Sequence, residues 1–212
     1  MKKACITIMT GFILLYAGQI SAQKLKSGDL TALKGQKTIN ISYDYSKMEV
    51  GKFKTEEEYV NKGTEERNKK KPGTGDEWAA RWNSGKIAKY QPAYEESFNK
   101  QAEECGIVGK ADPTATYTMI IHTNALEVGV ETVVMGSAKS AAVELVVDIA
   151  ETAAPEKIIA TIEMEAKPKS NMRMSVGGVP VNKEVYDPTL RVAECYETAG
   201  KQIGKMICKE LK

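Results

Sequence analysis

The sequence predicts an α+β fold in which an antiparallel sheet of about four strands carries two long helices packed on one face. Four segments alternate apolar with polar residues, which is typical of strands that have one face in water. Two other segments repeat apolar residues every three or four positions, as amphipathic helices do. About 190 of the 212 residues follow a leader-like N-terminus, a length that suits one domain.

Residues 1–22 have the layout of a secretory signal peptide. Two lysines precede an apolar stretch at 4–16, and small residues end the segment at Ala22. The apolar stretch is shorter than the roughly 20 residues that a membrane-spanning helix needs. We therefore expect cleavage after Ala22 and a periplasmic or secreted protein, with an uncleaved anchor as the alternative. Cys5 stands in the wrong place for lipid attachment, so a lipoprotein is not expected.

The charge of the chain disfavours two classes of partner. The whole chain has 30 Lys and Arg against 28 Asp and Glu, and the leader holds two of the lysines and no acid. The remainder is therefore neutral, which gives no electrostatic case for nucleic acid or an anionic membrane surface. No later run of about 20 apolar residues is present, so no membrane span is expected after the leader.

The first strand is expected at 38–45, where isoleucine and tyrosine alternate with polar residues. The polar, glycine-punctuated residues 23–37 before it predict a flexible lead-in. Residues 38–212 are then expected to form a single α+β domain with an inserted charged segment at about 46–82. In that segment Thr55 has the capping-box spacing that starts a helix.

The inserted segment contains two candidate binding features. Trp78 and Trp82 are four residues apart and therefore share one face of a helix. They either stack a sugar or aromatic ligand, or anchor the segment to the core. The basic run at 69–71 is either a partner site or a solvated face beside acidic residues.

The last helix, expected at 191–212, has an unusually wide apolar arc that includes Gly200 and Gly204. Glycine weakens a helix, so these two positions predict close approach of another element. The natural candidate is the preceding helix at Tyr94–Ala102, whose apolar residues recur at four-residue steps and which should end near Gly106.

Three more strands are expected at 117–122, 143–151 and 157–165, the last two as a hairpin. The stretches 129–140 and 167–188 between these elements are rich in glycine, proline or polar residues. Together with the Trp78/Trp82 segment, these loops are the expected working surface.

No catalytic residue, metal site or cofactor is predicted. His122 is the only histidine of the chain and is expected on the outer face of its strand, whereas a metal site needs several ligands at matched spacing. Adjacent glutamates at 57–58, 95–96 and 103–104 mostly point to water on their helices. A hydrolase that uses carboxylates is the enzyme alternative, and the sequence leans against it.

Three cysteines remain after the leader: Cys105, Cys195 and Cys208. Cys195 and Cys208 are 13 residues apart on one helix, about 20 Å, which is too far for a disulfide. Only Cys105 can pair with either of them. Cys208 is the favoured partner because it shares the side of Gly200 and Gly204, and three free thiols are the alternative.

The strand beginning at Tyr117, the hairpin Val143–Glu165 and the helix Val192–Leu211 follow one another in an order that resembles periplasmic domains of Gram-negative envelope proteins. The periplasmic domain of the curli-secretion pore is similar, as are related exported domains of unknown function. The resemblance implies an interaction module rather than an enzyme.

We therefore expect an exported envelope protein that acts as a non-catalytic binding or assembly module, with an envelope protein as its partner. The alternatives are the carboxylate hydrolase and a structural or oligomerising envelope component. The sequence does not predict the oligomeric state.

Overall fold

The computed structural model describes residues 23–129, 140–168 and 188–212. Its sheet has seven strands in the order β1-β7-β6-β5-β2-β4, with β3 paired to β5. The strands are β1 (Gln23–Gly28), β2 (Thr38–Asp44), β3 (Glu49–Val50), β4 (Val108–Lys110), β5 (Tyr117–Glu127), β6 (Ala142–Glu151) and β7 (Ala154–Ala166). The helices are α1 (Glu56–Lys70), α2 (Thr74–Gly85), α3 (Gln91–Ala102) and α4 (Pro188–Glu210).

The α+β class is confirmed, but the prediction of about four antiparallel strands is wrong. β1, β7, β6 and β5 pair antiparallel in that order, whereas β2 runs parallel to both β5 and β4. In the sequence, α1, α2 and α3 separate β2 from β4 and β5. The chain therefore crosses over through helices before it returns to the sheet, which allows these strands to pair parallel to β2. β3 and β4 have two and three residues, too few for a visible alternation.

Residues 23–37 are also not a flexible lead-in. They form the edge strand β1 and a short 3₁₀ helix at Leu30–Leu33, whose two leucines are each 1% exposed. The strand looks polar because Lys24 and Lys26 point to water at the edge of the sheet, where lysine is common.

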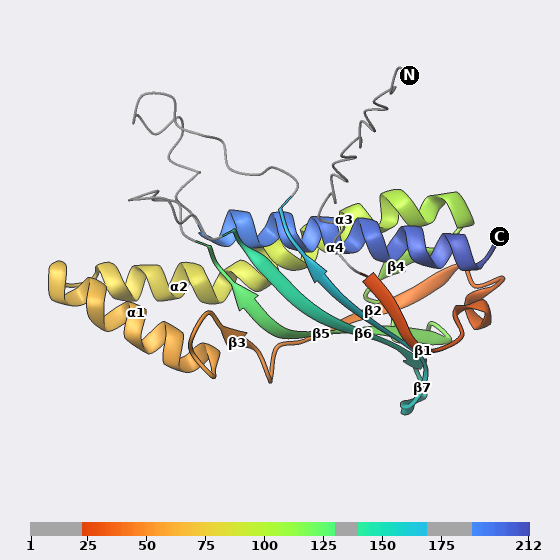
Figure 1. Ribbon diagram of the computed structural model, residues 1–212, viewed down its shortest axis with the longest axis horizontal. Coiled ribbons are helices and arrows are strands. Elements are labelled where there is room, and N and C mark those ends of the chain that lie inside the picture. Colours follow the sequence, from red (N-terminus) through yellow and green to blue (C-terminus); the bar gives the residue numbers. More distant parts are fainter. Residues whose placement is uncertain (1–22, 130–139, 169–187) are drawn as a thin grey trace, which may run out of the picture.

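Helices α3 and α4 lie side by side on one face of the sheet, and no described helix lies on the other, which we call the uncovered face (Figure 1). The core fills the space between them, with Ile121, Val147 and Ile162 from the sheet and Ile203 from α4 all fully buried. The alternation of buried and partly exposed residues in β6 and β7 explains why these strands were recognisable in the sequence.

The predicted close approach of α3 and α4 is confirmed. A Cβ atom on Gly200 would lie 3.1 Å from the backbone nitrogen of Phe98 and closer still to the carbonyl oxygen of Tyr94. On Gly204 it would lie 3.0 Å from the carbonyl oxygen of Phe98. Both glycines therefore serve the contact between the two helix backbones.

A disulfide between Cys105 and Cys208 joins the 3₁₀ helix Glu103–Cys105, which follows α3, to the last turn of α4, across 103 residues of sequence. Cys195 is a free, buried thiol, and burial raises its pKa to about 12. Such a thiol is almost entirely protonated near neutral pH and is a poor nucleophile. In the described ranges, none of the helices combines the length and the apolar character that crossing a bilayer requires.

Candidate binding surfaces

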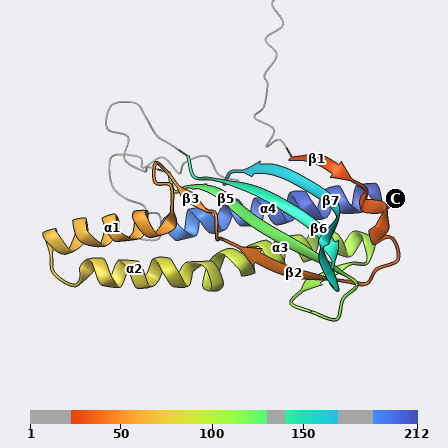
Figure 2. The same cartoon turned by 90° about the horizontal axis from the view of Figure 1, so that it is seen from below.

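Helices α1 and α2 form an antiparallel hairpin that extends well beyond the sheet (Figures 1 and 2). We call this hairpin, residues 56–85, the arm. It is built from most of the segment that the sequence marked as a charged insertion at 46–82. The 15 residues of α1 alone span about 22 Å. Thr55 caps α1 as predicted, because its hydroxyl accepts a hydrogen bond from the backbone N–H of Glu58 at 3.2 Å.

Aromatic side chains pack between the two helices of the arm. Trp78 and Trp82 stack with their ring centres 6.0 Å apart, and Tyr59 packs against both rings. The guanidinium of Arg67 lies 4.1 Å above the ring of Trp78. Phe53, at the base of the arm, contacts Tyr59 edge to face. This cluster holds α1 against α2 and is continuous with the core under the sheet.

The two tryptophans named as candidate binding residues are therefore interior. Trp78 is 8% exposed and Trp82 is 1% exposed, so neither indole presents a free face on which a sugar could stack. Their helices approach closely because the facing residue is Gly63, where a Cβ would lie 2.5 Å from the Trp78 ring. Of the two roles considered, burial supports the anchoring one, since both tryptophans belong to the same hydrophobic cluster as the core of the sheet.

An ion pair fixes the arm to the body of the protein. Both carboxylate oxygens of Glu56 accept from the Lys86 ammonium at 2.7 Å, and one also accepts from the Trp82 indole N–H at 2.8 Å. The Lys86 ammonium lies 5.5 Å from the centre of the Tyr45 ring. Lys86 begins a π-helical turn, Lys86–Tyr90, that connects α2 to α3. The arm is thus held at its base by a half-buried, charge-assisted contact.

The outside of the arm is charged. Lys69 pairs with Glu65 at 2.6 Å and Lys62 with Glu66 at 3.7 Å, both along α1. The basic run at 69–71 sits at the tip, where Lys70 and Lys71 are exposed. Acidic and basic residues thus alternate on the arm, and Lys70 and Lys71 extend past the acidic residues of α1.

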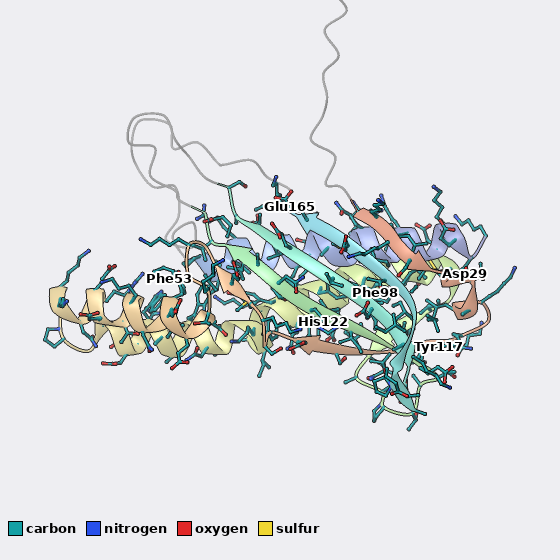
Figure 3. The ribbon with its side chains drawn as sticks, turned by 60° about the horizontal axis from the view of Figure 1, so that its bottom comes forward. Asp29, Phe53, Phe98, Tyr117, His122 and Glu165 are labelled. Atoms are coloured by element: carbon teal, nitrogen blue, oxygen red, sulfur yellow. A yellow bond between two sulfur atoms is a disulfide. The ribbon has the colours of Figure 1, made fainter. Side chains whose placement is uncertain are left out.

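The second surface is the uncovered face of the sheet, which Figure 3 shows from the front with His122 near its middle. Nδ1 of His122 lies 2.8 Å from a carboxylate oxygen of Asp44, and Nε2 lies 3.4 Å from one of Asp148. The hydroxyl of Thr161 donates to Asp148 at 2.6 Å. Hydrogen bonds from Ser46, and after them the one from His122, lower the pKa of Asp44 to about 2.

His122 lies on the outer face of its strand, as the alternation in the sequence predicted. Asp44 and Asp148 were missed as its neighbours. They are directly opposite and diagonally opposite His122 in the strand register, which alternation within one strand does not reveal.

A third surface is a half-open groove of about 560 Å³ between α3 and α4. Its lining consists of Ala93, Glu96, Ser97, Lys100, Gln101, Glu104, Glu197 and Lys201. The acidic and basic side chains are mixed, so the groove has no single charge that selects a ligand. It holds Glu96 and Glu104, one member of each of two adjacent-glutamate pairs noted in the sequence.

A carboxylate hydrolase needs an acid whose pKa is raised so that it carries a proton near neutral pH. Four carboxyl groups in the described residues have clearly shifted pKa values, and hydrogen bonds lower all four: Asp29, Asp44, Glu65 and Asp112. The described part of the chain also contains no group of three or more His, Cys, Asp or Glu residues arranged to hold a metal ion. Most of the two loops expected to be functional, 129–140 and 167–188, lies outside the described residues.

No protein-family model and no curated protein sequence matches the chain. Among solved structures it is similar to the PelC dodecamer from Paraburkholderia phytofirmans, at 9% identity, with 91% of this chain and 97% of that chain covered and a TM-score of 0.39. It is also similar to protein XCC0632 from Xanthomonas campestris, at 17% identity, with 55% and 57% covered and a TM-score of 0.32. Neither supports the resemblance to the curli-secretion pore, and such low scores leave the function to be argued from the residues of the chain.

Proposed function

We propose that this chain is an exported, non-catalytic binding or assembly module of the cell envelope, and that it contacts its partner through the arm. The observation that carries the proposal is the aromatic core of the arm. Trp78, Trp82 and Tyr59 hold together two helices that extend beyond the sheet.

The construction of the arm favours a contact role over a role in stability. Helices α3 and α4 lie over the sheet, whereas most of α1 and α2 extends beyond it (Figure 1). A pair of helices held together by aromatic packing, with charged residues along its outside, presents a preformed surface to a partner. Preformed surfaces lose less conformational entropy on binding than flexible ones do.

The location in the envelope rests on residues 1–22, whose lysines, short apolar stretch and small residues before Gln23 match a secretory leader. A disulfide between Cys105 and Cys208 is in keeping with an oxidising compartment.

Site-specific photocrosslinking in the native cell tests the proposal. A photoreactive residue is placed at Glu66, Lys70 or Arg81 on the arm, and at Lys205 or Lys209 on α4 as matched controls, all of them exposed positions on helices. We expect a discrete adduct from the arm positions and none from α4. A second copy of the chain as the captured protein indicates assembly, and another protein indicates binding. Adducts from α4 alone, or none from the arm, contradict the proposal.

A further inference from the structure

The folded domain begins at the residue that follows the expected leader. Strand β1 starts at Gln23, which pairs with Met164 of β7, and the leader is expected to end at Ala22. Cleavage after Ala22 therefore makes Gln23 the N-terminal residue and leaves it within a strand of the sheet. The chemistry of this residue then determines how the sheet begins.

The start of β1 lies at the margin of the hydrophobic core. Gln23 and Leu25 are half-buried, whereas Lys24 between them is exposed. Met164 is 4% exposed, and directly paired residues of an antiparallel sheet point to the same face. The side chain of Gln23 therefore lies on the covered face beside apolar residues. Its amide oxygen, Oε1, is buried and has no hydrogen-bond partner among the described residues.

A free N-terminus places an unfavourable charge at this margin. The α-ammonium group that cleavage creates is largely charged near neutral pH, and it loses hydration beside apolar side chains. Two exposed lysines, Lys24 and Lys26, follow on the same strand. The acids that flank the paired residue of β7 already have partners, since Glu163 pairs with Lys26 and Glu165 pairs with Lys167. Removal of the terminal charge therefore favours the folded strand.

Glutamine has a reaction that is open to it only at an N-terminus. Its α-amine and its side-chain amide belong to one residue, so they meet without a loss of translational freedom and close a pyrrolidinone ring. The amine nitrogen attacks Cδ and forms a C–N bond, the bond between Cδ and Nε2 breaks, and ammonia leaves with one proton of the amine. The product, pyroglutamate, is a cyclic amide with one N–H and no charge. Nothing is oxidised or reduced, and no co-reactant is consumed.

We propose that Gln23, made N-terminal by the export on which the proposed function rests, is converted to pyroglutamate in the mature protein. The ring gives the start of β1 a neutral amide nitrogen, as the uncut chain has at this position, instead of an ammonium. It also blocks enzymes that remove residues from a free amine. Loss of a few residues from this end would remove the pairs that hold β1 to β7, so the modification protects an edge of the sheet.

Mass spectrometry of the protein exported by its native cell tests the proposal. The full chain, leader included, is expressed, and the mature protein is purified and cut before aspartate, which releases Gln23–Gly28 because Asp29 follows it. We expect the main form of this peptide to be lighter than the synthetic linear peptide by the mass of one ammonia molecule. An isotope-labelled linear peptide added at cell lysis should stay linear, which excludes cyclisation during purification.

Gln23→Met is the matched control, since methionine has a similar length but no amide that can close the ring. Its N-terminal peptide should keep the full mass of the linear sequence. A wild-type peptide that begins with linear Gln23 overturns the cyclisation and leaves the export intact. A purified chain that still carries residues 1–22, or one that begins at another residue, contradicts the cleavage after Ala22 and overturns the cyclisation with it.

Pyroglutamyl aminopeptidase provides a second readout, because it removes only a cyclised N-terminal residue. Treatment of the released wild-type peptide should shorten it by one residue and leave Lys24 at its start, whereas the peptide from Gln23→Met should be unchanged. A wild-type peptide that is not shortened, under conditions that shorten a synthetic pyroglutamyl peptide, overturns the proposal.

Discussion

Replacing Gly200 with alanine tests how closely α3 and α4 are packed. The new methyl group would lie 3.1 Å from the backbone nitrogen of Phe98 and closer to the carbonyl oxygen of Tyr94. Both atoms belong to the backbone of α3, so no side-chain rotation can make room, and the two helices must move apart.

The expected magnitude is the difference between two opposing effects. Alanine is better than glycine inside a helix by about 1 kcal/mol. Forcing an extra methyl group into a packed interior costs about 1–3 kcal/mol, and a clash with backbone belongs at the upper end. Gly200→Ala should therefore lower the free energy of unfolding by about 2 kcal/mol, although alanine is the better helix former.

Urea unfolding followed by circular dichroism measures this loss. Lys205→Ala, at an exposed position on the same helix, should change stability by no more than about 0.5 kcal/mol. Gly204→Ala should fall between the two, because the new methyl group would lie 2.9 Å from the Cβ of Gln101 and 3.0 Å from the carbonyl oxygen of Phe98, a milder clash than the one with the Tyr94 carbonyl at Gly200. A Gly200→Ala protein that is as stable as wild type would refute the packing argument.

Three further predictions concern the disulfide, the arm and an acid on the uncovered face. Replacing both Cys105 and Cys208 with alanine should lower the free energy of unfolding by about 2–5 kcal/mol, toward the upper end because the disulfide closes a long loop. Urea unfolding measures this loss, and an unchanged unfolding midpoint contradicts the prediction. Trp82→Ala should destabilise the arm by about 3–5 kcal/mol. The helical circular dichroism and the near-ultraviolet tryptophan signal should decrease, while amide exchange in β6 and β7 stays slow. Loss of exchange protection in those strands would show that the arm does not unfold as a separate unit. The pKa of Asp44 is held at about 2, below its ordinary value, so its contribution to stability is present above about pH 4 and is lost as the pH falls toward 2. Asp44→Asn should flatten that part of the acid-unfolding curve, and a variant curve parallel to wild type argues against the lowered pKa.

The elements that were predictable from the sequence are those whose apolar residues repeat regularly within a single segment. The hairpin of β6 and β7 alternates cleanly because one face is buried and the other is in water. In α4, the glycines stood out because they interrupt a strong amphipathic pattern, and the structure shows them against the backbone of α3.

The elements that were missed depend on pairing between distant segments. β1 has polar side chains because it is an edge strand, so its strand character lies in backbone hydrogen bonds to β7. β2 runs parallel to β5 because helices connect them in the sequence. The residue pattern of either strand alone does not reveal this direction. The neighbours of His122 were missed for the same reason, since Asp44 and Asp148 meet it only through the register.

The spacing of Trp78 and Trp82 predicted a shared helical face and left two roles open, a ligand platform and an anchor. Their spacing does place them on one helical face, but that face is covered by α1, and Gly63 allows the close fit. A single sequence does not show which element covers an aromatic face, so a ligand platform and a small core have the same pattern.

The measurement that tests the central proposal most directly is photocrosslinking from the arm in cells. With the photoreactive residue at Lys70 or Arg81, a partner or a second copy of the chain should be captured, and with the same residue at Lys205 it should not. Capture should persist in Lys205→Ala and weaken in a variant with Lys70 and Lys71 both changed to glutamate, provided that variant unfolds at the wild-type urea concentration. Crosslinked adducts from α4, with none from any position on the arm, would contradict the assignment of the arm as the binding surface.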